Sequence, residues 1–337
     1  MLVLGIETSC DETSAGVVSD RHLLSNVIFS QDEIHRKFGG VVPELAGRRH
    51  IEVITEVVNS ALEKAGVRLN EIEAVAVTQG PGLVVCLLVG LGVAKAIAFS
   101  RKIPLVGVNH LEGHLFAIFL ENKEVEFPLL GLIASGGHTI LCLVEDWGRY
   151  QVLGQTLDDA AGEALDKAGK LLGLDYPGGK EIDRISRNAN SKAVSFPIAF
   201  TKQSQFDYSF SGLKTALLHY VKNHPELKDN PSALADLSAS YQEAVVQGLL
   251  GRAEKAVERF KIERIVLSGG VASNFRLREA FSEFVQKKRI KLLVPSARLC
   301  TDNAVMIALV GEEKLKRGIQ DDFRLDARAV LGLENWR

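Results

Sequence analysis

The sequence has few cysteines and no excess of either charge. Four cysteines occur among its 337 residues, none in a CxxC pair, which argues against a zinc ribbon and for reduced thiols in a cytoplasmic setting. The formal net charge of −2 gives no global signal for nucleic acid or membrane, so any polyanion contact must be local or come from a partner. No basic region opens the chain, and its longest apolar run, residues 83–98, is interrupted by glycines. We therefore expect no signal peptide and no membrane span.

The length and the order of apolar segments predict an α/β protein of two lobes. A chain of 337 residues suits two lobes of roughly 150 residues each. Short buried strands are expected at residues 2–6, 72–78, 104–108, 129–134 and 262–267, with helices between several of them.

Two histidines four residues apart follow the expected strand at residues 104–108. If the segment Asn109-His110-Leu111-Glu112-Gly113-His114 is helical, His110 and His114 lie on one face and can bind one divalent cation. They can equally be two ordinary, partly buried histidines. A zincin peptidase carries glutamate directly after the first histidine, whereas Leu111 stands there and Glu112 points away, so a peptidase is disfavoured.

Asp302 is a candidate third ligand. It lies near the start of an expected helix, where an aspartate is by default an N-terminal cap. As a ligand it would complete a His/His/Asp set that leaves coordination positions open for water or substrate, as a catalytic metal requires.

A strand followed by Ser-Gly-Gly occurs twice, at Ser135-Gly136-Gly137 and at Ser268-Gly269-Gly270. One glycine pair is usually only a turn, but glycines at a strand end also let backbone amides approach phosphate oxygens. Together with the acidic, hydroxyl-rich hairpin at residues 7–14, the two pairs favour a nucleotide held in a cleft between two lobes.

For several other polar residues the sequence allows either a ligand-binding role or a structural one. Asp166 and Asp183 suit ribose hydroxyls or are helix caps and surface charges. Lys214 could reach an anion, and the sequence does not decide whether it does. Arg48-Arg49-His50 and the basic run at residues 287–291 could contact RNA, but solvated helix faces are the simpler account.

Eight segments resemble, in order, those of the TsaD family of tRNA threonylcarbamoyltransferases: GIETSCDETSAGVV, GGVVPELAGRRH, NHLEGH, ASGGHT, YPGGKEID, FDYSFSGLKTA, LSGGVASN and CTDNA. The resemblance covers nearly the whole chain. It implies the two-lobed actin/Hsp70/hexokinase-like fold with an interlobe nucleotide cleft. It also implies transfer of the threonylcarbamoyl group of threonylcarbamoyl-AMP to N6 of adenosine 37 in tRNAs that read ANN codons, releasing AMP. We expect an N-terminal lobe of residues 1–128 joined by 303–337, and a C-terminal lobe of 129–302.

The resemblance also implies roles for individual residues. His110, His114 and Asp302 correspond to ligands of a catalytic metal, iron in most relatives and zinc in some. The contacts with the substrate adenylate, or with ATP, ADP or AMP in the same cleft, correspond to Ile133, Ala134, Ser135, Gly136, Gly137, Asp166, Gly179, Asp183 and Asn274. Archaeal and eukaryotic relatives carry a tyrosine ligand on the strand before the Ser-Gly-Gly turn, and its absence here resembles the bacterial branch.

The bacterial resemblance implies partners: tRNA, a shorter TsaB-like paralogue and a TsaE-like ATPase, with no membrane. The small residues of the helix after Gly82 would suit a pairing surface. Three alternatives stay open at this point: a kinase or ATPase of the same fold, a metalloendopeptidase, and a scaffold without activity.

Overall fold

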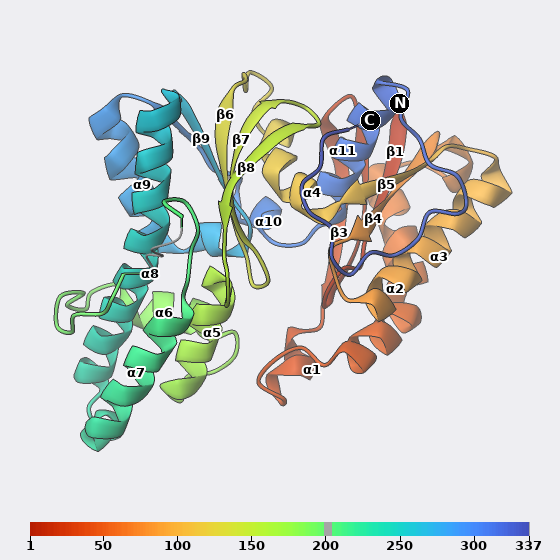
Figure 1. The fold of residues 1–337 in the computed structure, drawn as a ribbon. Helices are drawn as coiled ribbons and strands as arrows, with labels where there is room; N and C mark the ends of the chain where they lie inside the picture. The colour runs from red at the N-terminus through yellow and green to blue at the C-terminus, as the bar shows by residue number, and fades with distance from the viewer. Residues whose placement is uncertain (199–203, 337) are drawn as a thin grey trace. The chain divides into compact units, whose positions relative to one another are not determined.

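The computed structural model of the chain describes residues 1–198 and 204–336. These residues form two compact units (Figure 1). The first unit contains residues 1–125 and 295–335, and the second contains residues 126–294 and Trp336. Residues 295–302, which include Asp302, were expected in the C-terminal lobe but lie in the first unit.

The first unit is built on a five-stranded sheet in the order β3-β2-β1-β4-β5. Its strands are β1 (Leu2–Glu7), β2 (Glu12–Ser19), β3 (His22–Ser30), β4 (Ala74–Gly80) and β5 (Leu105–Asn109). Strands β1, β2 and β3 pair antiparallel, while β1, β4 and β5 run parallel. The carboxyl ends of β1, β4 and β5 therefore meet at one edge, where a site is expected in such sheets.

Helices lie on both faces of this sheet. The helical segments are α1 (Asp32–Arg36), α2 (Pro43–Ala65), η1 (Leu69–Glu71), α3 (Val84–Arg101), α4 (His110–Phe116), η2 (Ala117–Leu120), α10 (Ala297–Cys300) and α11 (Ala304–Lys316). Along β1, Leu4 and Ile6 point into the core formed with α2 and α3. Gly5 points to the other face, where an added Cβ would lie 2.1 Å from the Ala304 carbonyl of α11. The alternation of β1 side chains thus assigns one face to each helix layer.

The second unit repeats the topology of the first. Its sheet has the order β10-β9-β6-β7-β8, with β6, β7 and β8 antiparallel and β6, β9 and β10 parallel. The strands are β6 (Leu129–Ala134), β7 (Thr139–Asp146), β8 (Arg149–Gln155), β9 (Arg264–Ser268) and β10 (Lys291–Leu293). The helical segments are α5 (Ala161–Leu171), α6 (Gly178–Ser186), α7 (Ser211–Asn223), η3 (Pro225–Asp229), α8 (Pro231–Phe260), η4 (Gly270–Ser273) and α9 (Phe275–Lys288).

Several elements differ from the sequence-based expectation. The carboxylates in residues 158–167 favour a helix that begins at Asp158. Helix α5 begins only at Ala161, because the carboxylate of Asp158 accepts hydrogen bonds from the backbone of Phe210 and Ser211 at the start of α7. The helix expected near Asp302 is α11, which begins at Ala304, two residues after Asp302, and ends at Lys316.

Among the described residues, one helix, α3, is long and apolar enough to cross a membrane by length and composition. Of its residues, 39% are buried, and Leu91, Ala94 and Ala98 belong to the core of the first unit. Because core helices of globular proteins meet the same criterion, this helix is weak support for a span.

Candidate functional site

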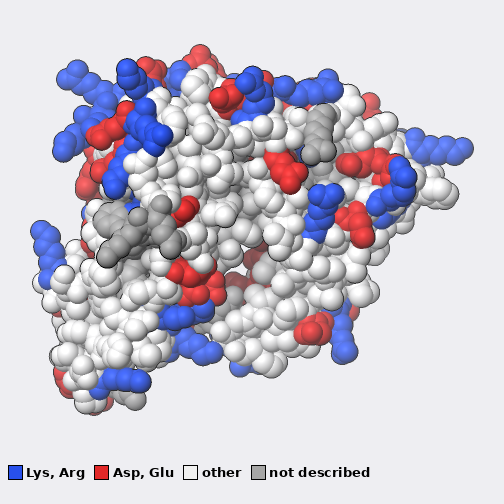
Figure 2. Space-filling model, in the orientation of Figure 1, with Lys and Arg blue, Asp and Glu red and all other residues white. Residues whose placement is uncertain are grey.

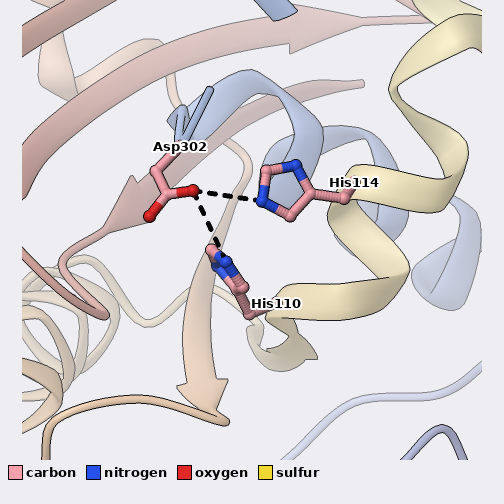
Figure 3. Close-up of side chains that lie close together, drawn as sticks. All are labelled: His110, His114 and Asp302. Carbon is pink, nitrogen blue, oxygen red and sulfur yellow. Dashed lines mark hydrogen bonds and ion pairs between the residues drawn. The ribbon is translucent and has the colours of Figure 1, made fainter. Parts of the chain in front are cut away.

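His110 and His114 lie on one face of the short helix α4, at the carboxyl end of β5. Asn109 caps the helix, since its side chain accepts a hydrogen bond of 2.9 Å from the Leu111 amide. The two ring centroids are 4.6 Å apart and the rings are nearly perpendicular. Both Nε2 atoms point toward Oδ1 of Asp302, at 3.5 Å from His110 and 3.0 Å from His114 (Figure 3). The structure therefore brings together the three residues that the sequence nominated as ligands.

Asp302 reaches this cluster from the turn between α10 and α11. The N-cap of α11 is Asn303, whose side chain accepts a hydrogen bond from the Met306 amide, so the default reading of Asp302 as the cap is wrong. The Asp302 side chain is 21% exposed, whereas those of His110 and His114 are 7% and 0% exposed. Solvent or a substrate can thus approach the cluster at the carboxylate.

The donor set suits a divalent metal ion. One nitrogen of each histidine and one oxygen of Asp302 all lie within 4.8 Å of one another. Two imidazoles and one carboxylate are a donor set used for Zn²⁺ and Fe²⁺ in catalytic sites that retain open positions. Glu112, in contrast, lies 3.6 Å from Lys314 and is not part of the cluster.

Glu7, which the sequence analysis did not single out, contacts the other ring nitrogen of His110. Its Oε2 lies 2.9 Å from His110 Nδ1, and its side chain is fully buried. Burial opposes protonation of His110, but the Asp302 and Glu7 carboxylates outweigh it and raise the pKa of His110 to about 9. Burial likewise opposes ionisation of Glu7, yet His110 holds the Glu7 pKa below its usual value. In the metal-free chain the two groups therefore form an ion pair.

A second group of carboxylates comes from the turn after β1, from the first residue of β2 and from α1. Oxygens of Asp11, Glu12 and Asp32 lie within 4.8 Å of one another. Burial and the neighbouring carboxylates raise the pKa values of Asp11 and Glu12. This group consists of carboxylates alone, and acidic groups of this kind are common without an ion, so we assign it no metal.

In the second unit, the Ser-Gly-Gly turn at residues 135–137 joins β6 to β7. The Ser135 amide donates to the His138 carbonyl at 2.8 Å, and the His138 amide donates to the Ser135 hydroxyl at 3.1 Å. Gly136 and Gly137 are exposed, and nothing lies within 4 Å of a Cβ added to either. Ile133 and Ala134 are fully buried in β6, so their side chains do not face solvent.

The second glycine pair, Gly269-Gly270, follows β9. Gly269 has a φ of 86°, and a Cβ there would lie 2.4 Å from the Ala134 carbonyl, so only glycine fits. The turn leads through η4 to Asn274, the N-cap of α9. The Asn274 side chain accepts from the Leu277 amide at 2.9 Å and donates to Gln242 at 2.8 Å.

Asp166 and Asp183 link the helices around these turns. Asp166 accepts a hydrogen bond of 2.8 Å from the Gly179 amide at the start of α6. Asp183 accepts one of 3.0 Å from the Phe275 amide at the start of α9. A Cβ on Gly162 of α5 would lie 2.6 Å from the Ser135 carbonyl. The predicted nucleotide contacts therefore lie in one connected region, formed by the carboxyl ends of β6 and β9 and the adjoining parts of α5, α6 and α9.

Lys214 lies in α7, where its ammonium group is 3.3 Å from Asp159. The same aspartate binds Lys167 of α5 at 2.7 Å. Through Asp159, Lys214 of α7 is thus linked to Lys167 of α5.

Comparison with known proteins gave matches over nearly the whole chain. Residues 22–309 match the family described as TsaD, tRNA N6-adenosine threonylcarbamoyltransferase. A protein of that name from Syntrophus aciditrophicus (strain SB) is 54% identical over 331 residues, which are 97% of this chain and 96% of the relative.

Two solved structures resemble the chain in fold. One is an activator of 2-hydroxyisocaproyl-CoA dehydratase from Clostridium difficile, with a TM-score of 0.53 and 14% identity over 96% of this chain and 99% of that one. The other is HypF from T. kodakarensis, with a TM-score of 0.63 and 13% identity over 94% of this chain and 48% of that one.

Proposed function

The chain belongs to the TsaD family of tRNA N6-adenosine threonylcarbamoyltransferases, and we propose that His110, His114 and Asp302 form its metal centre. The enzyme transfers the threonylcarbamoyl group of threonylcarbamoyl-AMP to N6 of adenosine 37 in tRNAs that read ANN codons, releasing AMP. The two sheets of equal topology and the structural likenesses confirm the predicted α/β fold of the actin/Hsp70/hexokinase type.

The observation that carries the proposed centre is the convergence of both Nε2 atoms on one carboxylate oxygen. The imidazoles of His110 and His114 would hold the ion from the buried side, and Asp302 from the more exposed side. A divalent ion bound there supplies a Lewis acid that stabilises negative charge developing on the substrate. Iron is our first candidate, and zinc suits the same donors.

We place the adenylate on the second unit. The exposed amides of Gly136, Gly137 and Gly270 can donate to phosphate oxygens, and the N-terminus of α9 adds its positive dipole. Ile133, Ala134 and Ser135 would position the first of these turns, since they form the end of β6 and its hairpin. ATP, ADP or AMP would use the same groups.

Asp166, Gly179, Asp183 and Asn274 complete the proposed adenylate site. Their hydrogen bonds connect helix α5 to the start of α6 and helix α6 to the start of α9, which supports a rigid surface for the ribose. Holding the adenylate in one geometry favours departure of AMP as the amine attacks.

Direct transfer to the adenine amine is preferred to a covalent enzyme intermediate. In direct transfer, N6 bonds to the carbamoyl carbon, the bond from that carbon to the phosphate oxygen breaks, and N6 loses a proton. Cys10 lies near Asp302, but burial and the nearby Asp11 and Asp302 carboxylates raise the pKa of its thiol well above the usual value. A thiol that stays protonated is a poor nucleophile.

We propose that tRNA, a TsaB-like paralogue and a TsaE-like ATPase act with this chain in the cytoplasm. Helix α3 exposes Val84, Val85 and Leu88 side by side near its start, which supports a protein contact there. On the face in Figure 2, basic and acidic side chains are interspersed without a large area of one sign. This supports a tRNA contact that is shared with partners.

The test is transfer of carbon-labelled threonylcarbamoyl from its adenylate to an unmodified ANN-decoding tRNA, with the paralogue and ATPase present. We expect transfer by the wild-type chain, loss with a chelator, and loss in His110→Ala, whose unfolding should remain cooperative. Glu112→Gln, on the same helix but outside the cluster, is the matched control and should retain transfer. Full transfer by His110→Ala would refute the proposed metal centre.

A further inference from the structure

The buried carboxylate of Glu7 supports the candidate metal centre from the far side of His110. It contacts Nδ1, whereas Asp302 faces Nε2 of the same ring. We propose that Glu7 is a positioning residue that keeps a proton on Nδ1 of His110, so that the metal displaces the proton of Nε2 and binds there. This inference rests on the metal centre proposed above.

Three contacts orient the Glu7 carboxylate. Oε2 accepts hydrogen bonds from His110 Nδ1 at 2.9 Å and from the Thr78 hydroxyl at 2.6 Å, and Oε1 accepts one from the Ser9 amide. Glu7 and Thr78 lie at the carboxyl ends of the paired strands β1 and β4. The sheet itself therefore holds the carboxylate, and a buried carboxylate with this many donors does not swing away without leaving donors unpaired.

Ser9 is a second possible hydrogen-bond partner of His110 Nδ1, so the orientation of the Glu7 carboxylate decides which ring nitrogen is protonated. The Ser9 hydroxyl lies 3.2 Å from the same Nδ1 atom and can accept a hydrogen bond from it or donate one to it. A carboxylate can only accept, so Glu7 requires a proton on Nδ1. Without Glu7, Ser9 could donate to Nδ1, the ring proton would move to Nε2, and His110 could not bind the metal there.

Replacing Glu7 by glutamine should produce this wrong tautomer at nearly unchanged volume. The Ser9 amide can only donate, so the amide oxygen of glutamine takes the place of Oε1. Its NH₂ group then takes the place of Oε2 and donates to His110 Nδ1. A change from carboxylate to amide that reverses a histidine tautomer is known to disable the Asp–His pair of a serine protease.

The experiment measures the dissociation constant of Zn²⁺ for the full chain at pH 7.5, by competition with a chromogenic chelator. We expect Glu7→Gln to bind Zn²⁺ about 10- to 100-fold more weakly than wild type, the usual effect of removing such a partner. Glu112→Gln removes a buried carboxylate of the same helix that faces Lys314, and it should bind within twofold of wild type. Equal affinity of Glu7→Gln and wild type, or an equal loss in Glu112→Gln, would overturn the proposal.

A second measurement does not depend on folding of the variant. In the zinc-loaded wild-type chain with ¹⁵N-labelled histidine, we expect the long-range ¹H–¹⁵N pattern of a ring that is protonated at Nδ1 and bound through Nε2. The His110 signals are assigned by their absence in His110→Ala. Binding of His110 through Nδ1 would overturn the role of Glu7 while leaving the metal centre intact. A wild-type chain that binds no metal would instead overturn the centre itself, and with it this inference.

Discussion

Replacing Gly5 by alanine should disturb the proposed metal centre indirectly, through the contact between β1 and α11. An added Cβ at Gly5 would lie 2.1 Å from the Ala304 carbonyl oxygen and 2.9 Å from the Ala308 amide nitrogen. Both are backbone atoms of α11, so a change of side-chain rotamer cannot relieve the clash. Ordinary contacts begin near 3.4 Å, so the start of the helix must move by roughly 1 Å or more.

That movement would be transmitted to Asp302, which lies two residues before Ala304. Its Oδ1 is 3.0 Å from His114 Nε2, so a shift of this size would break the contact between the two side chains. Overpacking of a core costs about 1–3 kcal/mol. We therefore expect Gly5→Ala to lower the free energy of unfolding by about that amount and to weaken Zn²⁺ binding as well.

The assay is guanidinium unfolding of the metal-free chain together with the Zn²⁺ competition described above. Gly92→Ala is the matched control, because nothing lies within 4 Å of a Cβ at that position of α3. It should stabilise the chain by about 0.5–1 kcal/mol, the cost of glycine in a helix interior, and should not change Zn²⁺ affinity. Unchanged stability and unchanged Zn²⁺ affinity in Gly5→Ala would refute the reasoning.

Two further predictions concern the second unit. Asp158→Ala removes the acceptor for Phe210 and Ser211 at the start of α7 and should cost about 0.5–2 kcal/mol in thermal or guanidinium unfolding. Burial raises the pKa of Asp158, but hydrogen bonds from Ser209 and Ser211 outweigh it and lower the pKa. The difference from wild type should therefore be largest above about pH 4 and decrease as the pH falls through the folded-state pKa, because a protonated carboxyl is a weaker acceptor; a difference that does not change with pH would contradict this. Tyr208→Phe should leave stability unchanged or raise it by up to about 1 kcal/mol, since the buried hydroxyl has no hydrogen-bond partner among the described residues; a clear loss of stability would show that the hydroxyl is satisfied.

Local rules were enough to predict the parts of the site that lie close together in sequence. The spacing of His110 and His114 predicted a shared helix face, and α4 places both rings on it. The strand-Gly-Gly pattern predicted turns at Gly136 and Gly269, and the structure has turns at both. In each case a few neighbouring residues determine the backbone.

The rest depends on contacts between residues far apart in sequence. Glu7 was read only as part of a polar turn, because its partners Thr78 and His110 follow 71 and 103 residues later. An acidic residue that ends a buried strand was the one available signal. A helix was expected to begin near Asp302, but its end at Lys316 was not, because Ala304 to Val310 are apolar on every side and fully buried, which leaves no amphipathic period to follow.

The equal topology of the two sheets indicates how one arrangement serves two kinds of site. In the first sheet Ile6 pairs with Val77, and in the second sheet Ile133 pairs with Ser268 at the equivalent position. The residues that follow these pairs are Glu7 and Thr78 in the first unit and Ala134 and Gly269 in the second, so they occupy equivalent positions.

In the second unit these places hold small residues, and the absence of a Cβ at Gly269 lets the turn after β9 pack against the Ala134 carbonyl. In the first unit the same places hold a carboxylate and a hydroxyl, which are hydrogen-bonded to each other, and the carboxylate also contacts His110. Small residues at this edge suit close approach of backbone amides to phosphate, whereas Glu7 and Thr78 suit the support of a metal ligand. The chemical difference between the two candidate sites therefore begins with the two residues that end the paired central strands.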